Sequence, residues 1–149
     1  TSDNKYIISG SDDRTIAIWS IADKILFHRF EEAHSELITS VEVTRDSKYI
    51  IFVSKDNTIG VWSIADKTLL HRFEEAYSGW IASVVAVQVQ EYIISGFDDM
   101  SIGVWSIEDK SLFHRFEEAY SKVFTSIAVT SNNKYIISGS WDKTIKVWS

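Results

Sequence analysis

This chain of 149 residues has no cysteine and no proline, and it contains only 6 glycines and a single methionine. The absence of cysteine excludes disulfide bonds, thiolate metal sites and cysteine nucleophiles, so the fold must be held by packing. No apolar run approaches the roughly 20 residues that a membrane-spanning helix needs. No signal peptide is visible at the start. We expect an intracellular, cytoplasmic protein. The chain begins with Thr1 and its one methionine is Met100, which indicates a fragment or a processed chain.

Acidic residues outnumber basic ones, 21 to 15. The formal net charge is −6 and no basic run is present, although 45% of the residues are hydrophobic, as in a globular domain. Nucleic-acid binding depends on lysine and arginine side chains that neutralise phosphates, so this charge speaks against a nucleic-acid partner. It mildly favours basic or neutral partners, and we expect neither nucleic acid nor a membrane as the partner.

A repeat of 43 residues runs through the whole chain. Each unit ends in Trp-Ser, with the tryptophans at Trp19, Trp62, Trp105 and Trp148. The chain thus divides into a partial unit, 1–20, and three full units, 21–63, 64–106 and 107–149. The first two full units match at 24 of 43 positions, and the partial unit matches the last twenty residues at 15 of 20. We interpret residues 1–149 as one domain built by tandem duplication.

Within a unit, the pattern predicts four short antiparallel strands. In the first copies they are YIISGS at 6–11, TIAIWS at 15–20, ILFHRF at 25–30 and ITSVEVT at 38–44, all rich in β-branched and aromatic residues. Short polar turns separate them, and no unit contains a useful amphipathic helix. A sheet of this size cannot bury both faces by itself, so neighbouring sheets must stack face to face, as in a β-propeller. The fold class is therefore all-β, with about 3.5 blades of this kind in the chain.

The segment YIISGSWDKTIKVWS at 135–149 closely resembles the end of a WD repeat, and AHS at 33–35 resembles the Gly-His pair that opens the next one. The resemblance covers essentially the whole chain. It implies a propeller, usually of seven blades, that binds proteins or peptides and is rarely an enzyme.

The resemblance also implies a structural network of histidine, serine or threonine, aspartate and tryptophan in each blade. The aspartate maps to Asp13, Asp56, Asp99 and Asp142, and the tryptophan to the set above. The histidine is present only as His34, because Tyr77 and Tyr120 replace it. The serine is present as Ser9, Ser95 and Ser138, whereas Phe52 replaces it in the unit that keeps His34. No unit carries the whole network, so we expect some buried polar groups to be unsatisfied.

Two further readings concern catalysis and metals. His34, Asp56 and nearby serines resemble a hydrolase triad on paper. However, an aspartate stands at the position of Asp56 in every unit, including the units without the histidine, which favours a structural role.

The hexapeptide HRFEEA occurs at 28–33, 71–76 and 114–119. Its histidine and first glutamate point to opposite faces of a strand, so we expect no metal and no cofactor. Its glutamate pair is either a solvated edge or an acidic docking belt. The third unit has VQVQE at 87–91 where the others have a hairpin turn, which predicts an irregular loop.

Two positions differ between units while the framework stays constant, and the resemblance places both on the top face. The position before the inner strand holds Leu37, Trp80 and Val123, and the position before the turn aspartate holds Asp12, Lys55, Asp98 and Trp141. Exposed aromatic residues beside acidic ones are typical of binding hot spots. Packing of these tryptophans against adjacent loops is the alternative.

Three functions remain open. We expect a non-catalytic scaffold that binds protein or peptide at the top face. The second possibility is an assembly module whose blade faces self-associate or complete a larger propeller. The third is a propeller hydrolase, which needs several acids converging on the axis. Glu42 is the one acid of the inner strands, with Val85 and Ala128 at the equivalent positions, which disfavours it. The first blade lacks an inner strand and the last lacks an outer strand, so a partner or a longer chain must complete the ring.

Overall fold

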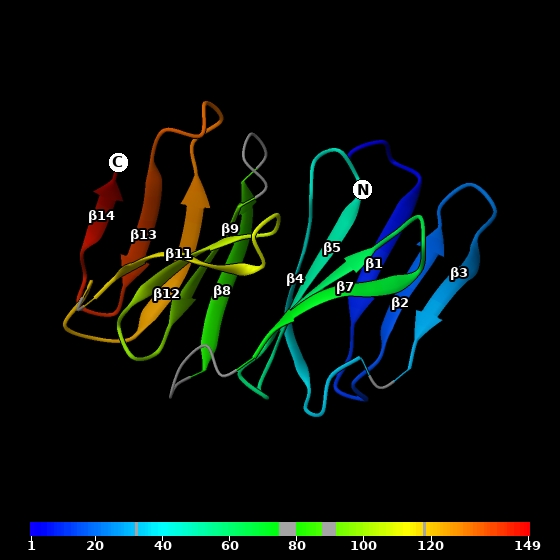
Figure 1. Cartoon of the computed structure of the whole chain (residues 1–149), viewed down its shortest axis with the longest axis horizontal. Coiled ribbons are helices and arrows are strands. Elements are labelled where there is room, and N and C mark those ends of the chain that lie inside the picture. Colours follow the sequence, from blue (N-terminus) through cyan, green and yellow to red (C-terminus); the bar gives the residue numbers. More distant parts are fainter. Residues whose placement is uncertain (32, 75–79, 88–91, 118) are drawn as a thin grey trace. The chain divides into compact units, whose positions relative to one another are not determined.

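The computed structural model describes residues 1–31, 33–74, 80–87, 92–117 and 119–149. The chain forms two compact units, 1–74 and 75–149, which are described separately. The all-β prediction is confirmed, because the described residues form antiparallel strands and turns and include no helix. Each unit contains two sheets of three or four strands, which correspond to propeller blades (Figure 1).

Unit one holds the first two blades. Blade one consists of β1 (Tyr6–Gly10), β2 (Ile16–Ser20) and β3 (Ile25–Phe30) in that order. Blade two consists of β4 (Ile38–Val43), β5 (Tyr49–Ser54), β6 (Ile59–Ser63) and β7 (Thr68–Phe73). The four strands predicted from the first copies are all present, and blade one lacks an inner strand as expected.

Unit two repeats this arrangement with the missing strand at the other end. Blade three consists of β8 (Ile81–Val87), β9 (Tyr92–Phe97), β10 (Ile102–Ser106) and β11 (Ser111–Phe116). Blade four consists of β12 (Phe124–Val129), β13 (Ile136–Ser140) and β14 (Ile145–Trp148), without an outer strand in the described chain. Every inner strand carries a β-bulge near its start, as between Ile81 and Ser83.

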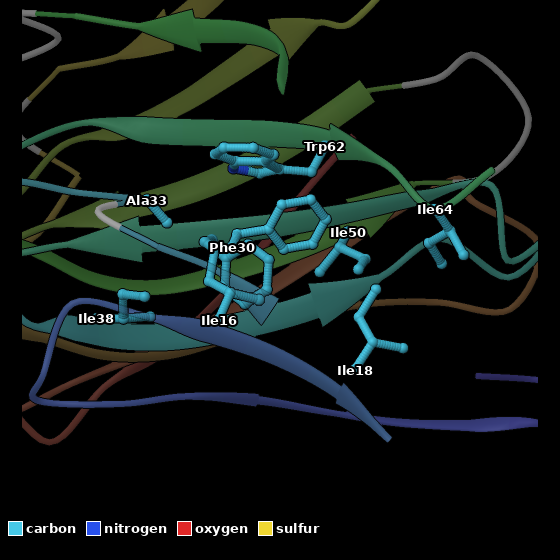
Figure 2. Close-up of a cluster of buried hydrophobic side chains, with 9 residues drawn as sticks. Ile16, Ile18, Phe30, Ala33, Ile38, Ile50, Trp62 and Ile64 are labelled. Atoms are coloured by element: carbon cyan, nitrogen blue, oxygen red, sulfur yellow. The ribbon is translucent and has the colours of Figure 1, made fainter. Parts of the chain in front are cut away.

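The core of unit one lies between its two blades. Ile16, Ile18 and Phe30 of blade one pack against Ile50 and Trp62 of blade two (Figure 2). The Phe30 and Trp62 rings lie 4.6 Å apart between centroids. This packing buries the apolar face of each sheet, which is the expected reason for stacking blades.

The core of unit two has the same design. Ile102 and Val104 of blade three pack with Phe124 and Ile127 of blade four. The ring centroids of Phe116 on the outer strand and Trp148 of the next blade lie 4.9 Å apart, a pairing like that of Phe30 and Trp62. Within each unit, Phe30 and Phe116 are thus packing residues that join their own blade to the following one.

The tight turns explain how so few glycines suffice. In the described residues, ten non-glycine residues adopt a left-handed backbone conformation, and no glycine does so. They recur with the 43-residue period, as at Lys24, Lys67 and Lys110, where φ is 58°, 58° and 55°. Gly96 instead serves close packing, because a Cβ there would come within 2.2 Å of the Phe124 ring in the next blade.

Candidate binding surface and structural network

The two variable positions of each unit are neighbours in space. The backbone amide of Asp98 donates to the carbonyl of Trp80, and that of Trp141 donates to the carbonyl of Val123, both at 3.0 Å. In unit one, the amide of Lys55 donates to the carbonyl of Leu37 at the same distance, 3.0 Å. Positions separated by 18 residues in the sequence therefore form one pair beside the start of each inner strand.

Unit two brings two such pairs together. Its inner strands β8 and β12 are in contact and run in the same direction (Figure 1). Trp80 and Val123 directly precede these two strands, so both pairs lie at the same end of the unit. Trp80 is 59% exposed and Trp141 is 69% exposed, and Val123 is exposed beside them. Leu37 and Asp98 are half-buried, whereas Lys55 and Asp12 are exposed.

In blade two, His34 belongs to a buried polar network. Its Nδ1 atom lies 3.1 Å from Asp56 Oδ2 and 3.0 Å from Thr58 Oγ1. Asp56 also accepts hydrogen bonds from the backbone amides of Ser35 and Thr58 at 3.0 Å each. Burial favours the neutral acid, but the hydrogen bonds from His34 and Thr58 outweigh it and hold the pKa of Asp56 far below its usual value.

The other side of this histidine has no partner. His34 Nε2 and Trp62 Nε1 are buried and make no hydrogen bond among the described residues. Both atoms face Gly60, where a Cβ would lie 3.2 Å from His34 Nε2 and 3.0 Å from Trp62 Nε1. The expected unsatisfied groups are thus present, because Phe52 stands where the other units have a serine hydroxyl. A hydrolase triad needs a nucleophile at this nitrogen, and the described residues supply none.

The other blades keep the serine and use it. Trp19, Trp105 and Trp148 each donate from Nε1 to a serine hydroxyl, respectively Ser9 at 3.2 Å, Ser95 at 2.8 Å and Ser138 at 2.7 Å. In blade four, the Tyr120 hydroxyl bonds to the Ser138 side chain and carbonyl. Tyr120, which stands where the second unit has His34, therefore bonds directly to the serine of its blade, a contact that the sequence did not reveal. Tyr77 lies outside the described residues.

The turn aspartate serves every blade in the same way. Asp13, Asp56, Asp99 and Asp142 each accept hydrogen bonds from the side chain and the backbone amide of the residue two positions later, Thr15, Thr58, Ser101 and Thr144. These bonds close the turn before each tryptophan strand. The 43-residue spacing of the aspartates is thus explained by turn structure.

The segment HRFEEA is a structural part with three separate contacts. Each histidine packs edge-on against the phenylalanine two residues later, with centroids 4.4 Å apart for His28 and Phe30. Two of the arginines reach a polar partner in their own blade: Arg72 donates to the carbonyl of Ala33, and Arg115 Nη2 donates to Asp99 Oδ2 at 2.8 Å. The first glutamates, Glu31, Glu74 and Glu117, are exposed. Their neighbours Glu32, Glu75 and Glu118 lie outside the described residues, as does most of the loop VQVQE.

One carboxyl group stands apart from these networks. Glu42 on β4 is half-buried, and burial raises its pKa. Among the groups of the described chain with a resolved shift, Glu42 is the single acid whose pKa is raised. Val85 and Ala128 at the equivalent positions add no second acid. A paired-carboxylate site of the kind a propeller hydrolase needs is therefore not assembled from these positions.

Among the described residues, no group of three or more histidine, aspartate or glutamate side chains could hold a metal ion. The same part of the chain has no helix long and apolar enough to cross a membrane.

A comparison with known protein families matches residues 1–20, 26–63 and 110–149 to the WD domain, G-beta repeat. Together these three regions cover more than half of the chain. A search of curated proteins finds no match.

Proposed function

This chain belongs to the WD-repeat family, whose domains generally bind proteins or peptides, and on that basis we propose that it is a non-catalytic scaffold that binds its partner through Trp80, Asp98, Val123 and Trp141. We call these four residues the top patch. The observation that carries the proposal is that two exposed tryptophans, from neighbouring blades, lie at the same end of unit two.

The chemistry of the top patch indicates its partner. Exposed tryptophans supply large apolar area at low conformational cost, which is why they dominate binding hot spots. Asp98, whose backbone is hydrogen-bonded to that of Trp80, adds a carboxylate to the top patch. The chain as a whole carries a net charge of −6. We therefore propose an apolar peptide segment with a basic residue as the ligand, rather than nucleic acid or a membrane.

A peptide library displayed on phage tests this function directly. Peptides selected on the wild-type chain should bind it in a fluorescence-polarisation assay, and Trp80→Ala/Trp141→Ala should weaken their binding at least tenfold. Phe113→Ala is the matched control, because Phe113 is an equally exposed aromatic residue, 62%, on the outer strand β11 of the same unit. Failure to select any peptide, or peptides that bind the double variant as tightly as wild type, would contradict the proposal.

The other candidate functions have less support. A hydrolase lacks a nucleophile at His34 Nε2 and a second acid beside Glu42 among the described residues. The assembly function does not compete with peptide binding, because it uses the faces of the terminal blades rather than the top patch.

A further inference from the structure

On blade four, two apolar residues are exposed whose equivalents in the other blades are buried. Ile145 and Val147 on β14 are 76% and 64% exposed, whereas Ile16 and Ile18, three repeats earlier, are both 0% exposed. Ile102 and Val104, one repeat earlier, are 0% and 8% exposed. We call Ile145 and Val147 the C-terminal face.

Blade one exposes the complementary surface. Ile7, Trp19 and Ile21 are 57%, 39% and 44% exposed, whereas Ile50, Trp62 and Ile64, one repeat later, are 0%, 9% and 8% exposed. Ile7 and Trp19 are direct cross-strand partners on β1 and β2, so they form one continuous apolar surface. We call Ile7, Trp19 and Ile21 the N-terminal face.

The molecule contains its own example of these two faces packed together. In unit one, Ile16 and Ile18 of blade one lie in a single buried cluster with Ile50, Trp62 and Ile64 of blade two (Figure 2). These residues are the repeat equivalents of the C-terminal face and of the N-terminal face, respectively. We propose that the C-terminal face of one copy of this chain docks on the N-terminal face of a second copy, in the way that blade one docks on blade two.

Blade four is equipped to form this contact with three strands. In the other blades, an arginine of the outer strand lies opposite a small residue of the tryptophan strand, as Arg72 lies opposite Gly60. Arg72 donates to the carbonyl of Ala33. At the position equivalent to Gly60, β14 has Lys146, which donates to the carbonyl of Ala119, the equivalent of Ala33. Blade four thus makes with Lys146 of β14 the contact that blade two makes with Arg72 of its outer strand β7.

The contact between copies is weaker than the contact inside unit one. The internal interface also uses Phe30 of an outer strand and Val41 and Val43 of an inner strand. Blade four has no outer strand and blade one no inner strand in this chain, so these contributions are missing at the proposed contact. Because buried apolar area drives such packing, we expect association that is reversible and depends on concentration. The contact joins two different faces, so it is heterologous and leaves one free face at each end of a pair.

Two substitutions at exposed positions test the pairing of unlike faces. Ile145→Glu disables the C-terminal face, and Ile7→Lys disables the N-terminal face. In sedimentation velocity over a hundredfold concentration range, wild type should grow from monomer to dimer and larger species. Each variant alone should stay monomeric. An equimolar mixture should form dimers and stop there, because one intact face of each kind remains.

The control and the opposing outcomes are equally specific. Ile25→Glu places the same charge at a 57% exposed isoleucine of β3, where the equivalent residues are Thr68 and Ser111, and it should associate like wild type. A wild-type chain that stays monomeric throughout would overturn the proposal. So would Ile7→Lys that still dimerises alone, since this means that like faces pair. Circular dichroism of each variant confirms that a monomeric result reflects a folded chain, and a mixture without dimers also contradicts the proposal.

Discussion

Single residues decide which blade of this chain satisfies its buried polar groups. In blade two, His34 and Trp62 point unpaired nitrogens toward the same space above Gly60. In blade three, Trp105 donates to Ser95 at 2.8 Å. The difference comes from one substitution, because Phe52 occupies the position of Ser95. A buried donor without an acceptor costs free energy in the folded state, so Trp62 and Trp105 contribute differently to the stability of their blades.

Replacing each tryptophan by phenylalanine measures that difference. Trp62→Phe removes an N–H group that has no acceptor, whereas Trp105→Phe breaks a hydrogen bond and leaves the Ser95 hydroxyl without its donor. Both variants lose similar packing, since both tryptophans are buried. We expect Trp105→Phe to lower the free energy of unfolding by about 1–2 kcal/mol more than Trp62→Phe does. Urea titrations followed by circular dichroism check this, and equal losses would show that the two indole groups are equivalent.

Asp56 should make the stability of unit one depend on pH. Its folded-state pKa lies below the unfolded value of about 3.9, so its contribution is present above about pH 4 and is lost as the pH falls. Asp56→Asn should lower the free energy of unfolding at pH 7 by about 2 kcal/mol, since it removes the charged acceptor of three residues. The gap between variant and wild type should narrow below pH 4. Asp142→Asn is the control: Tyr120 stands in place of the histidine there, and the expected gap is smaller.

The network contacts that could be predicted from the sequence are those that the WD-repeat pattern already names, such as His34 with Asp56 and Trp105 with Ser95. Asp56 and Thr58 are two residues apart, so their turn could be recognised from the repeat alone. Tyr120 and the arginines of HRFEEA were missed as network members. Tyr120 reaches Ser138 across 18 positions, and Arg115 reaches Asp99 because of strand register. Both contacts depend on how the strands pair, and strand register cannot be read from the spacing of residues in the sequence.

At the scale of strands, glycine sets how closely adjacent blades approach. Gly96 on β9 faces Phe124 of the next blade, and a Cβ there would lie within 2.2 Å of the ring. Gly139 holds the equivalent position on β13, where a Cβ would meet only Thr125 Oγ1 at 3.5 Å. Glycine at this repeat position therefore has a packing role in blade three that the equivalent glycine lacks in blade four.

Alanine at the two positions separates these roles. Gly96→Ala should destabilise the chain by about 1–3 kcal/mol, because the added methyl group forces Phe124 or the backbone to move. Gly139→Ala should change the free energy of unfolding by less than about 0.5 kcal/mol, or raise it slightly, because alanine reduces the freedom of the unfolded chain. Thermal unfolding of both variants beside wild type provides the comparison. A similar loss in both would mean that β13 is as crowded as β9.

At the scale of the whole chain, the repeat predicted the all-β class, the strand order and the incomplete first and last blades. Those features follow from a period that copies itself three times, so one unit predicts the others. The exposed faces could not be predicted in the same way, because Ile16 and Ile145 belong to the same pattern and differ only in what lies against them. Their 0% and 76% exposures distinguish a residue inside the array from one at its end.

The same end effect predicts how the whole molecule responds to heat. If the C-terminal face docks on the N-terminal face of a second copy, folded chains are stabilised by association, and the apparent Tm rises with protein concentration. Calorimetry of wild type from about 5 to 500 μM should show a steady increase, whereas Ile145→Glu should unfold at one temperature throughout, as reversible two-state monomers do. The variant should also match wild type at the lowest concentration, because Ile145 is already exposed in the single chain and contributes little to its core. A concentration-dependent Tm that persists in Ile145→Glu would place the stabilising contact on another surface.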